Sequence, residues 1–130
     1  HSTLATSTFG ATPALRCSSP LGVGIRNSII VSQGGTPPDE VSCAAASITY
    51  SATEGVVAGE GNIAVGMFPG ATPGDWFVDY ATGDLHLQND GLTLFADVAL
   101  WSTGDPLTDI DGDPRPGIDG TPDYAGADVP

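Results

Sequence analysis

Gly24-Ile25-Arg26-Asn27-Ser28-Ile29-Ile30-Val31 is the stretch of this sequence that indicates the fold most clearly. It is a short run of β-prone residues bounded by turn-forming residues. Working outward, similar short runs occupy residues 46–51, 62–68, 76–79 and 84–87, and each is bounded by Gly, Pro or Asp. Helical periodicity is scarce, because the 18 glycines and 11 prolines interrupt the apolar residues. We therefore expect an all-β chain with many tight turns.

The shortness of these strands favours a solenoid over a deep sandwich. In a parallel β-helix each coil supplies two or three strands of a few residues, and successive coils stack about 4.8 Å apart. Such a coil cannot bury its own apolar face and depends on its neighbours for that burial. The strand pattern therefore predicts a parallel β-helix.

Cys17 and Cys43 are the only two cysteines of the chain. Their separation is close to the length of one β-helix coil, so the two side chains can lie over each other on adjacent coils. Outside the cytoplasm such a pair forms a disulfide, and the alternative is two buried free thiols. We predict a disulfide between Cys17 and Cys43 and an exported protein.

The charge of the chain is strongly acidic. Three basic residues, all of them arginine, stand against sixteen Asp and Glu, which gives a net charge of −13. Such a surface repels phosphate backbones and anionic lipid, so nucleic-acid partners are not expected. No run of apolar residues approaches the roughly 20 that a membrane span requires, so membrane insertion is not expected either. A simpler role of the charge is to keep a β-rich protein soluble.

Several segments resemble, in order, the repeats of bacterial right-handed parallel β-helix proteins of the pectate-lyase-like superfamily. They are IRNSIIV (25–31), SITYSATEG (47–55), GNI (61–63), DWFVD (75–79), GDLHLQ (83–88), TDIDGDPRP (108–116) and DYAGAD (123–128). Residues 91–97 (GLTLFAD) depart from the family pattern. The resemblance implies the C-terminal portion of a right-handed β-helix, with about three to four coils over residues 1–104. Residues 105–130 would then form an acidic C-terminal closing motif and capping tail.

A β-helix of this length has an open N-terminal coil that something must cover. The candidates are upstream coils of the same polypeptide, a local cap, or other copies of the chain. The resemblance also implies a secreted protein, or one on the outer surface of a bacterial cell.

The sharpest chemical feature is the acidic cluster of the tail. Asp109, Asp111 and Asp113 occupy alternate positions with Gly112 among them, and Asp119 follows. Loops that bind Ca²⁺ through hard oxygen ligands use such a pattern. The full loop pattern lacks its bidentate Glu, and Asp-Gly-Asp also forms turns by itself. In that second interpretation Arg115 pairs with one of these carboxylates and holds the tail. Both interpretations stay open, with Ca²⁺ as the one candidate cofactor.

Structural roles are expected elsewhere. Asn27 and Asn62 suit left-handed backbone and hydrogen bonds along the stack. His86 alternates with Leu85 and Leu87, so it faces solvent if the leucines point inward. Two distant histidines with no adjacent nucleophile give little support to catalysis, so no catalytic residue is predicted.

The function expected from the sequence is a non-enzymatic extracellular module. It would be structural or adhesive, either stacking on itself into a fibre or ending a longer surface protein. Two alternatives stay open: the C-terminal part of a secreted polysaccharide lyase or hydrolase, and a calcium- or carbohydrate-binding module.

Overall fold

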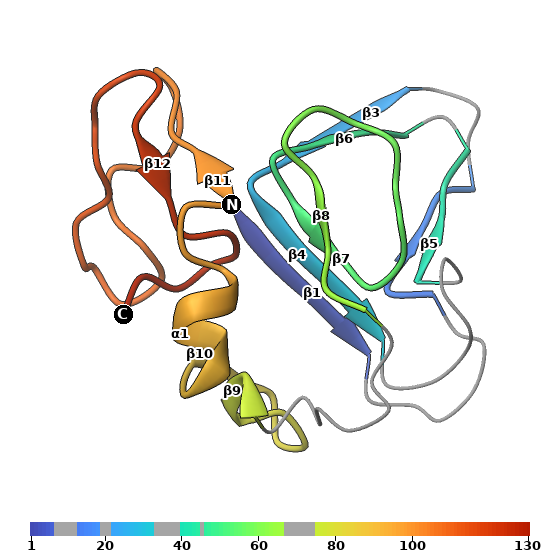
Figure 1. The fold of residues 1–130 in the computed structure, drawn as a ribbon, viewed down its shortest axis with the longest axis horizontal. Helices are drawn as coiled ribbons and strands as arrows, with labels where there is room; N and C mark the ends of the chain where they lie inside the picture. The colour runs from blue at the N-terminus through green and yellow to red at the C-terminus, as the bar shows by residue number, and fades with distance from the viewer. Residues whose placement is uncertain (7–12, 19–21, 33–39, 45, 67–74) are drawn as a thin grey trace.

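Short strands dominate the computed structural model, which describes residues 1–6, 13–18, 22–32, 40–44, 46–66 and 75–130 (Figure 1). The strands are β1 (Ser2–Thr6), β2 (Leu15–Arg16), β3 (Val23–Arg26), β4 (Ser28–Ser32), β5 (Val41–Ser42), β6 (Ala46–Thr49), β7 (Ala52–Thr53), β8 (Ile63–Ala64), β9 (Phe77–Asp79), β10 (Asp84–Leu87), β11 (Ala99–Leu100) and β12 (Pro122–Asp123). The one helix among the described residues is α1 (Asp90–Leu94). The strand predicted over residues 62–68 thus begins as β8, while its residues 67–68 lie outside the described part.

The largest sheet has four strands in the order β1-β4-β7-β8. All its pairs are parallel, and in them Ser2 lies opposite Ser28 and Ile29 opposite Ala52. Strand β4, which contains the deciding run of the sequence, is buried at every position. It is central because Ile29, Ile30 and Val31 are β-branched and fit a buried pleated surface.

Two smaller parallel pairs stand beside this sheet in Figure 1. Strand β2 pairs with β5, and β3 pairs with β6. The predicted disulfide is confirmed: Cys17 and Cys43 follow β2 and β5 and are bonded, with their Cα atoms 4.8 Å apart. Because the strands pair in parallel there, the two cysteines come side by side at their ends.

The C-terminal segment (residues 75–130) is built differently. Strands β9 and β10 form an antiparallel pair with an irregular register, and β11 pairs antiparallel with β12. Helix α1 lies between β10 and β11 in the chain. In Figure 1 this segment, coloured yellow to red, lies on one side of the four-stranded sheet.

The prediction of an all-β right-handed parallel β-helix with three to four coils and a C-terminal capping tail is therefore wrong. The described strands form five small separate sheets, two of them antiparallel, instead of one solenoid that continues to residue 104. A parallel crossover needs a connection of about a dozen or more residues, whereas an antiparallel pair needs only a short turn. Residues 80–83 are the whole connection between β9 and β10, so only antiparallel pairing was open to them.

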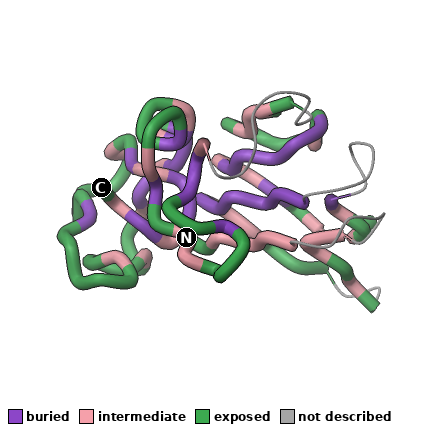
Figure 2. Tube along the Cα trace, turned by 90° about the horizontal axis from the view of Figure 1, so that it is seen from below, coloured by how far each residue is buried: buried purple, intermediate pink, exposed green. Residues whose placement is uncertain are grey.

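The main core joins the sheet to the C-terminal segment. Ile29, Val31 and Ala52 of the sheet are buried in one cluster with the aromatic residues of the segment. Those residues and their buried neighbours are Trp76, Phe77, Tyr80, Leu87, Phe95, Val98, Ala99 and Ala125. Trp76 meets Phe95 edge-on, with ring centroids 5.2 Å apart, while Phe77 stacks on Tyr80 at 5.8 Å. Buried backbone accordingly runs through the middle of the molecule in Figure 2.

Within the described part of the chain, no helix has the length and apolar character to cross a membrane.

Candidate metal centre

His86 lies in the middle of β10, the second strand of a tight hairpin. Gly83, with φ of 89°, closes the turn in a conformation that favours glycine, and Asp79 accepts a hydrogen bond from the backbone N–H of Thr82 at 3.2 Å. Successive side chains of a strand point to opposite faces. Leu87 is therefore buried in the core, while the imidazole of His86 is 45% exposed.

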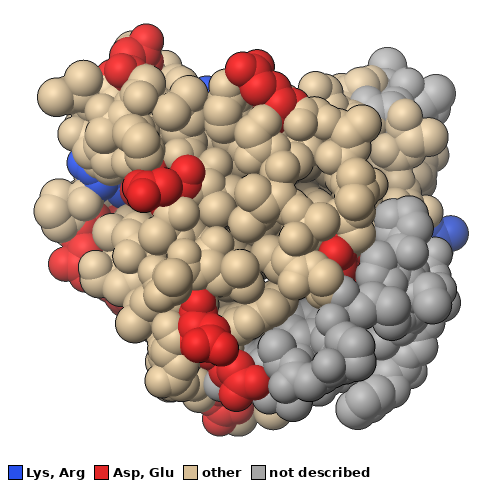
Figure 3. All heavy atoms as spheres, in the orientation of Figure 1, with Lys and Arg blue, Asp and Glu red and all other residues tan. Residues whose placement is uncertain are grey.

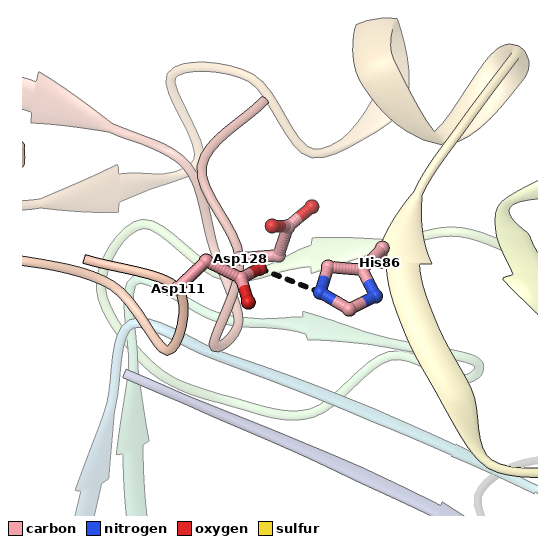
Figure 4. Close-up of side chains that lie close together, drawn as sticks. All are labelled: His86, Asp111 and Asp128. Atoms are coloured by element: carbon pink, nitrogen blue, oxygen red, sulfur yellow. Dashed lines mark hydrogen bonds and ion pairs between the residues drawn. The ribbon is translucent and has the colours of Figure 1, made fainter. Parts of the chain in front are cut away.

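Two aspartates of the C-terminal tail (residues 105–130) come to this histidine. Figure 4 shows Asp111 and Asp128 approaching His86 from the chain that runs past β10. Nε2 of His86 lies 2.6 Å from Oδ2 of Asp111. Asp128 is 8% exposed, and its Oδ2 accepts a hydrogen bond of 2.7 Å from the backbone N–H of Leu87. The tail is thereby joined to β10 at two successive residues.

Asp109 shapes the turn that presents Asp111. Its Oδ1 accepts the backbone N–H groups of Asp111 and Asp113, at 2.9 and 2.8 Å, and its Oδ2 accepts that of Val129 at 2.9 Å. Burial acts to raise the pKa of Asp109, but these backbone hydrogen bonds outweigh it and lower the pKa below its ordinary value. Asp109 thus stays ionised and holds the turn against the end of the chain.

The other ring nitrogen of His86 faces a third carboxylate. Nδ1 makes a short contact with Oδ1 of Asp84, which lies two residues earlier on the same strand. Hydrogen bonds to Asp84 and then to Asp111 raise the pKa of His86 to about 9. The same contact with His86 lowers the pKa of Asp84. The cluster therefore combines one imidazole with three carboxylates.

These donors suit a divalent metal ion. One ligand atom each from His86, Asp111 and Asp128 lies within 4.8 Å of the other two. Zinc takes imidazole nitrogen at about 2.0–2.1 Å and carboxylate oxygen at about 2.0–2.2 Å, so the donors would have to draw together around the ion. His86 and Asp111 are free to do so, because 45% and 51% of their side chains are exposed. Asp84 would orient the ring, since metal-binding histidines usually donate their second N–H to such a group.

A small cavity adjoins the cluster. Its volume is about 260 Å³, and it is lined by Thr3 of β1, by residues 83–86, and by Ile110, Ala127 and Asp128 of the tail. Most of that lining is aliphatic, apart from the cluster itself. A metal ion with three protein ligands keeps a position for water or another donor, and His86 and Asp128 border the cavity where such a donor can enter.

The four aspartates predicted from the sequence are not brought together as one group of ligands. Asp111 joins the His86 cluster, and Asp109 accepts hydrogen bonds from backbone. Asp119 accepts the backbone N–H of Thr103 at 2.5 Å, and Asp113 is exposed. Among the described residues, the set with ligand atoms within 4.8 Å is His86, Asp111 and Asp128.

The residues predicted to be structural lie in hydrogen-bonded positions. Asn27 has φ of 56° and is completely buried. Asn62 accepts the backbone N–H of Ser51 at 3.1 Å and donates to the carbonyl of Ile48 at 2.8 Å. Arg115 pairs with Asp123. The alternative to calcium had instead paired it with Asp109, Asp111, Asp113 or Asp119.

Sequence reasoning missed three of the four members of the cluster. His86 was expected to face solvent, and Asp84 and Asp128 were quoted only within the motifs GDLHLQ and DYAGAD. The alternation Leu85-His86-Leu87 is the one local signal, because it places a histidine on the opposite side from two core leucines. Nothing in the sequence says that the chain returns to this point 25 residues later.

Comparison with known proteins adds no family to this geometry. No protein-family model, no curated protein and no solved structure matches the chain.

Proposed function

We propose that this chain is a non-catalytic structural module of a protein exported to the bacterial cell exterior, and that a divalent metal ion joins its tail to β10. His86, Asp111 and Asp128 would bind the ion, with Asp84 orienting the imidazole. The observation that carries the proposal is the convergence of these ligand atoms from strand and tail within 4.8 Å. A metal bound there links residues that are 25 and 42 positions apart in the sequence, which is a structural role.

The donor set favours zinc over calcium. Ca²⁺ takes six to eight oxygen ligands, whereas imidazole with carboxylates suits zinc and related transition metals. The predicted Ca²⁺ site of Asp109, Asp111, Asp113 and Asp119 shares only Asp111 with this cluster, so substitution distinguishes the two proposals. Bound zinc would supply a rigid link with a formal charge of +2 among carboxylates.

The surface of the molecule also attracts cations. With a net charge of −13 and no lysine, the chain produces a negative potential that concentrates divalent ions near it. On the face shown in Figure 3, acidic groups occur at several separate places, and basic groups show only at the margins. The same charge opposes binding to polyanions, so a polysaccharide partner would have to be neutral.

Export is supported by the disulfide. A Cys17–Cys43 bond persists in oxidising surroundings and is rare in the cytoplasm. A partner is proposed at β1, which ends the strand order of the four-stranded sheet and has one neighbour, β4, among the described strands. Preceding residues of a longer polypeptide, or another copy of the chain, would pair with its other edge. Sedimentation of the purified chain tests the second of these, because a purely monomeric species excludes stacking between copies.

Calorimetric titration with Zn²⁺ tests the metal centre. We expect one ion per chain in the wild type and at least tenfold weaker binding in Asp111→Asn and in His86→Ala. Asp113→Asn is the matched control, because Asp113 lies in the same exposed turn outside the cluster. Asp84→Asn should weaken binding by about 10–100-fold, as expected for a residue that orients a ligand. Equal zinc binding by the wild type and Asp111→Asn would refute the site.

A parallel titration with Ca²⁺ separates the two metal proposals. If the four aspartates form a calcium site, Asp113→Asn and Asp119→Asn lower calcium affinity, and His86→Ala leaves it unchanged. The structural role has its own readout, since a ligand that binds only the folded protein stabilises it by about 2.7 kcal/mol at a hundred times its Kd. Zinc should raise the unfolding temperature of the wild type and of Asp113→Asn, but not that of Asp111→Asn.

A further inference from the structure

Two glutamates are buried near each other, one just before β5 and the other just after β7. Glu40 is 0% exposed and immediately precedes β5, while Glu54 is 7% exposed and directly follows β7. Oε1 of Glu40 accepts the backbone N–H of Gly55 at 2.9 Å. The carboxyl group of Glu40 is therefore held beside the residue that follows Glu54.

The second oxygen of Glu40 has no partner among the described residues. Oε2 is buried and receives no hydrogen bond from them, although a buried carboxylate oxygen without a donor is strongly unfavourable. Glu54 accepts the hydroxyl of Ser32, at 3.1 Å from its Oε2, and a backbone hydrogen bond of the same residue. Oε2 of Glu40 is therefore the atom that lacks a donor.

Among the described residues, no basic side chain pairs with either glutamate. It contains three basic residues, all arginine. Arg26 binds the carbonyl of Leu100 and Asp105, and Arg115 binds Asp123. Arg16 is exposed on β2, and no ion pair among the described residues includes Glu40 or Glu54. Two like charges in one buried place, with no counter-charge, favour retention of a proton.

We infer that Glu40 and Glu54 form a buried proton-binding site, in which the folded protein keeps a proton on Glu54 to a higher pH than the unfolded chain does. Burial raises the pKa of Glu54, hydrogen bonds from Ser32 oppose that rise without cancelling it, and the charge of Glu40 adds the smallest upward contribution. A protonated Glu54 gains an O–H donor, and Oε2 of Glu40 is a buried acceptor without a donor among the described residues. This inference is independent of the proposed metal centre.

The other groups around the pair do not neutralise it. Tyr80 lies within electrostatic reach of Glu54, but its hydroxyl donates to the carbonyl of Thr6 at 2.5 Å. Burial and the charge of Glu54 raise the pKa of Tyr80 to about 12, so it stays neutral at physiological pH. Ser32 contributes its hydroxyl and a backbone hydrogen bond, neither of which carries a charge, and Asp39, the neighbour of Glu40 in sequence, lies outside the described residues.

The consequence is a contribution to stability that is present in acid and lost as pH rises. In the unfolded chain Glu54 ionises at its ordinary pKa, so between that pKa and the raised pKa the folded state binds more protons than the unfolded state. The stabilisation is fully present below the ordinary pKa of Glu and is lost as pH rises through the raised pKa of Glu54. Where the difference is one full proton, the unfolding equilibrium constant rises tenfold per pH unit.

Urea unfolding across a pH series tests this, with the disulfide intact. The wild type should lose stability as pH rises through the raised pKa of Glu54. Glu54→Gln should lose less stability over the same range, by at most a factor of ten in the unfolding equilibrium constant per pH unit. Asp113→Asn is the control, because Asp113 is an exposed carboxylate and its substitution should leave the wild-type pH dependence unchanged. All three proteins retain His86, Asp111 and Asp128, so any contribution of that cluster cancels in the comparison. Identical pH dependence of the wild type and Glu54→Gln would overturn the inference.

Infrared spectroscopy provides a second readout that needs no folded variant. As pH rises, the C=O stretch of one protonated carboxyl group should persist in the folded wild type after the exposed carboxyl groups have ionised, and Glu54→Gln should lack this persistent band. Absence of that band from the folded wild type overturns the inference even if Glu54→Gln does not fold.

Discussion

Arg115 and Asp123 form an ion pair in the interior, with Nη1 2.8 Å from Oδ2 and only 1% and 3% of the two side chains exposed. Nη2 of the same guanidinium donates to the carbonyl of Gly126 at 3.0 Å. Asp123 lies on β12, so the arginine joins the proline-rich turn of the tail to the strand that returns from it. Planar guanidinium is suited to such a position, because it can bind a carboxylate and a carbonyl together.

Removal of one partner should be costly. In Asp123→Asn the buried guanidinium keeps its charge and loses its counter-charge, which typically destabilises by about 3–5 kcal/mol. The free energy of unfolding from urea denaturation measures the loss. Asp113→Asn, an exposed residue of the same tail, serves as the control. A loss in Asp123→Asn no larger than that of the control would show that the pair is dispensable.

The side-chain amide of Asn27 hydrogen-bonds to the backbone of β11 as a neighbouring strand would, and so connects the four-stranded sheet to β11. Its Oδ1 accepts the N–H of Leu100 at 3.1 Å, and its Nδ2 donates to the carbonyl of Leu100 at 3.0 Å. The residue also has a left-handed backbone, with φ of 56°. Both properties are typical of asparagine and explain why it stands between β3 and β4.

Two substitutions separate these properties. Asn27→Gly keeps the backbone conformation but removes the acceptor of the Leu100 N–H, at about 1–3 kcal/mol for a group left unsatisfied, while Arg26 still donates to the Leu100 carbonyl. Asn27→Ala adds the left-handed penalty of about 1–2 kcal/mol. Thermal unfolding should therefore rank the wild type above Asn27→Gly and Asn27→Gly above Asn27→Ala. Equal stabilities of the two variants would contradict a role for the backbone conformation.

The parts of the fold that the sequence predicts are those set by neighbouring residues. Turn residues delimited the runs that became β4, β6, β9 and β10, because Gly and Asp act on the backbone where they stand. The disulfide was predicted because only two cysteines had to be paired. Parallel pairing of the first strands does not extend to the C-terminal segment, and the short connection of residues 80–83 was the local signal against it.

The candidate site was only partly predictable for the same reason. Asp111 was singled out because of its neighbours Asp109 and Asp113, yet its partner is His86 of β10. Arg115 likewise pairs with Asp123 and not with the nearer aspartates. Which carboxylate meets which base depends on how the tail packs against β10 and β1. That packing cannot be deduced from a single sequence.

At Gly126 the tail packs directly against the four-stranded sheet. A Cβ atom there would lie 2.8 Å from Cδ1 of Ile29 and 2.8 Å from Oγ1 of Thr3, and its φ is 97°. Gly112 has nearly the same φ, 96°, but no atom within 4 Å of its Cβ position. The two glycines therefore differ in packing and not in backbone conformation.

Alanine substitution at both positions isolates the packing. Gly112→Ala should cost only the left-handed penalty of about 1–2 kcal/mol. Gly126→Ala adds overlap with Ile29 and Thr3, for which overpacking of about 1–3 kcal/mol is typical. Chemical denaturation of both variants gives the difference directly. If Gly126→Ala is no less stable than Gly112→Ala, the tail does not pack on the sheet as described.

The disulfide should contribute to stability through the unfolded chain. Cys17 and Cys43 are 26 residues apart, and closing a loop of that length removes unfolded-state entropy worth about 3.5 kcal/mol. The double variant Cys17→Ser with Cys43→Ser should therefore unfold at a lower urea concentration than the oxidised wild type. Reductant should shift the wild-type midpoint toward that of the variant and leave the variant unchanged. A reductant-induced shift of equal size in both proteins would assign the effect to something other than this bond, because the variant has no cysteine left to reduce.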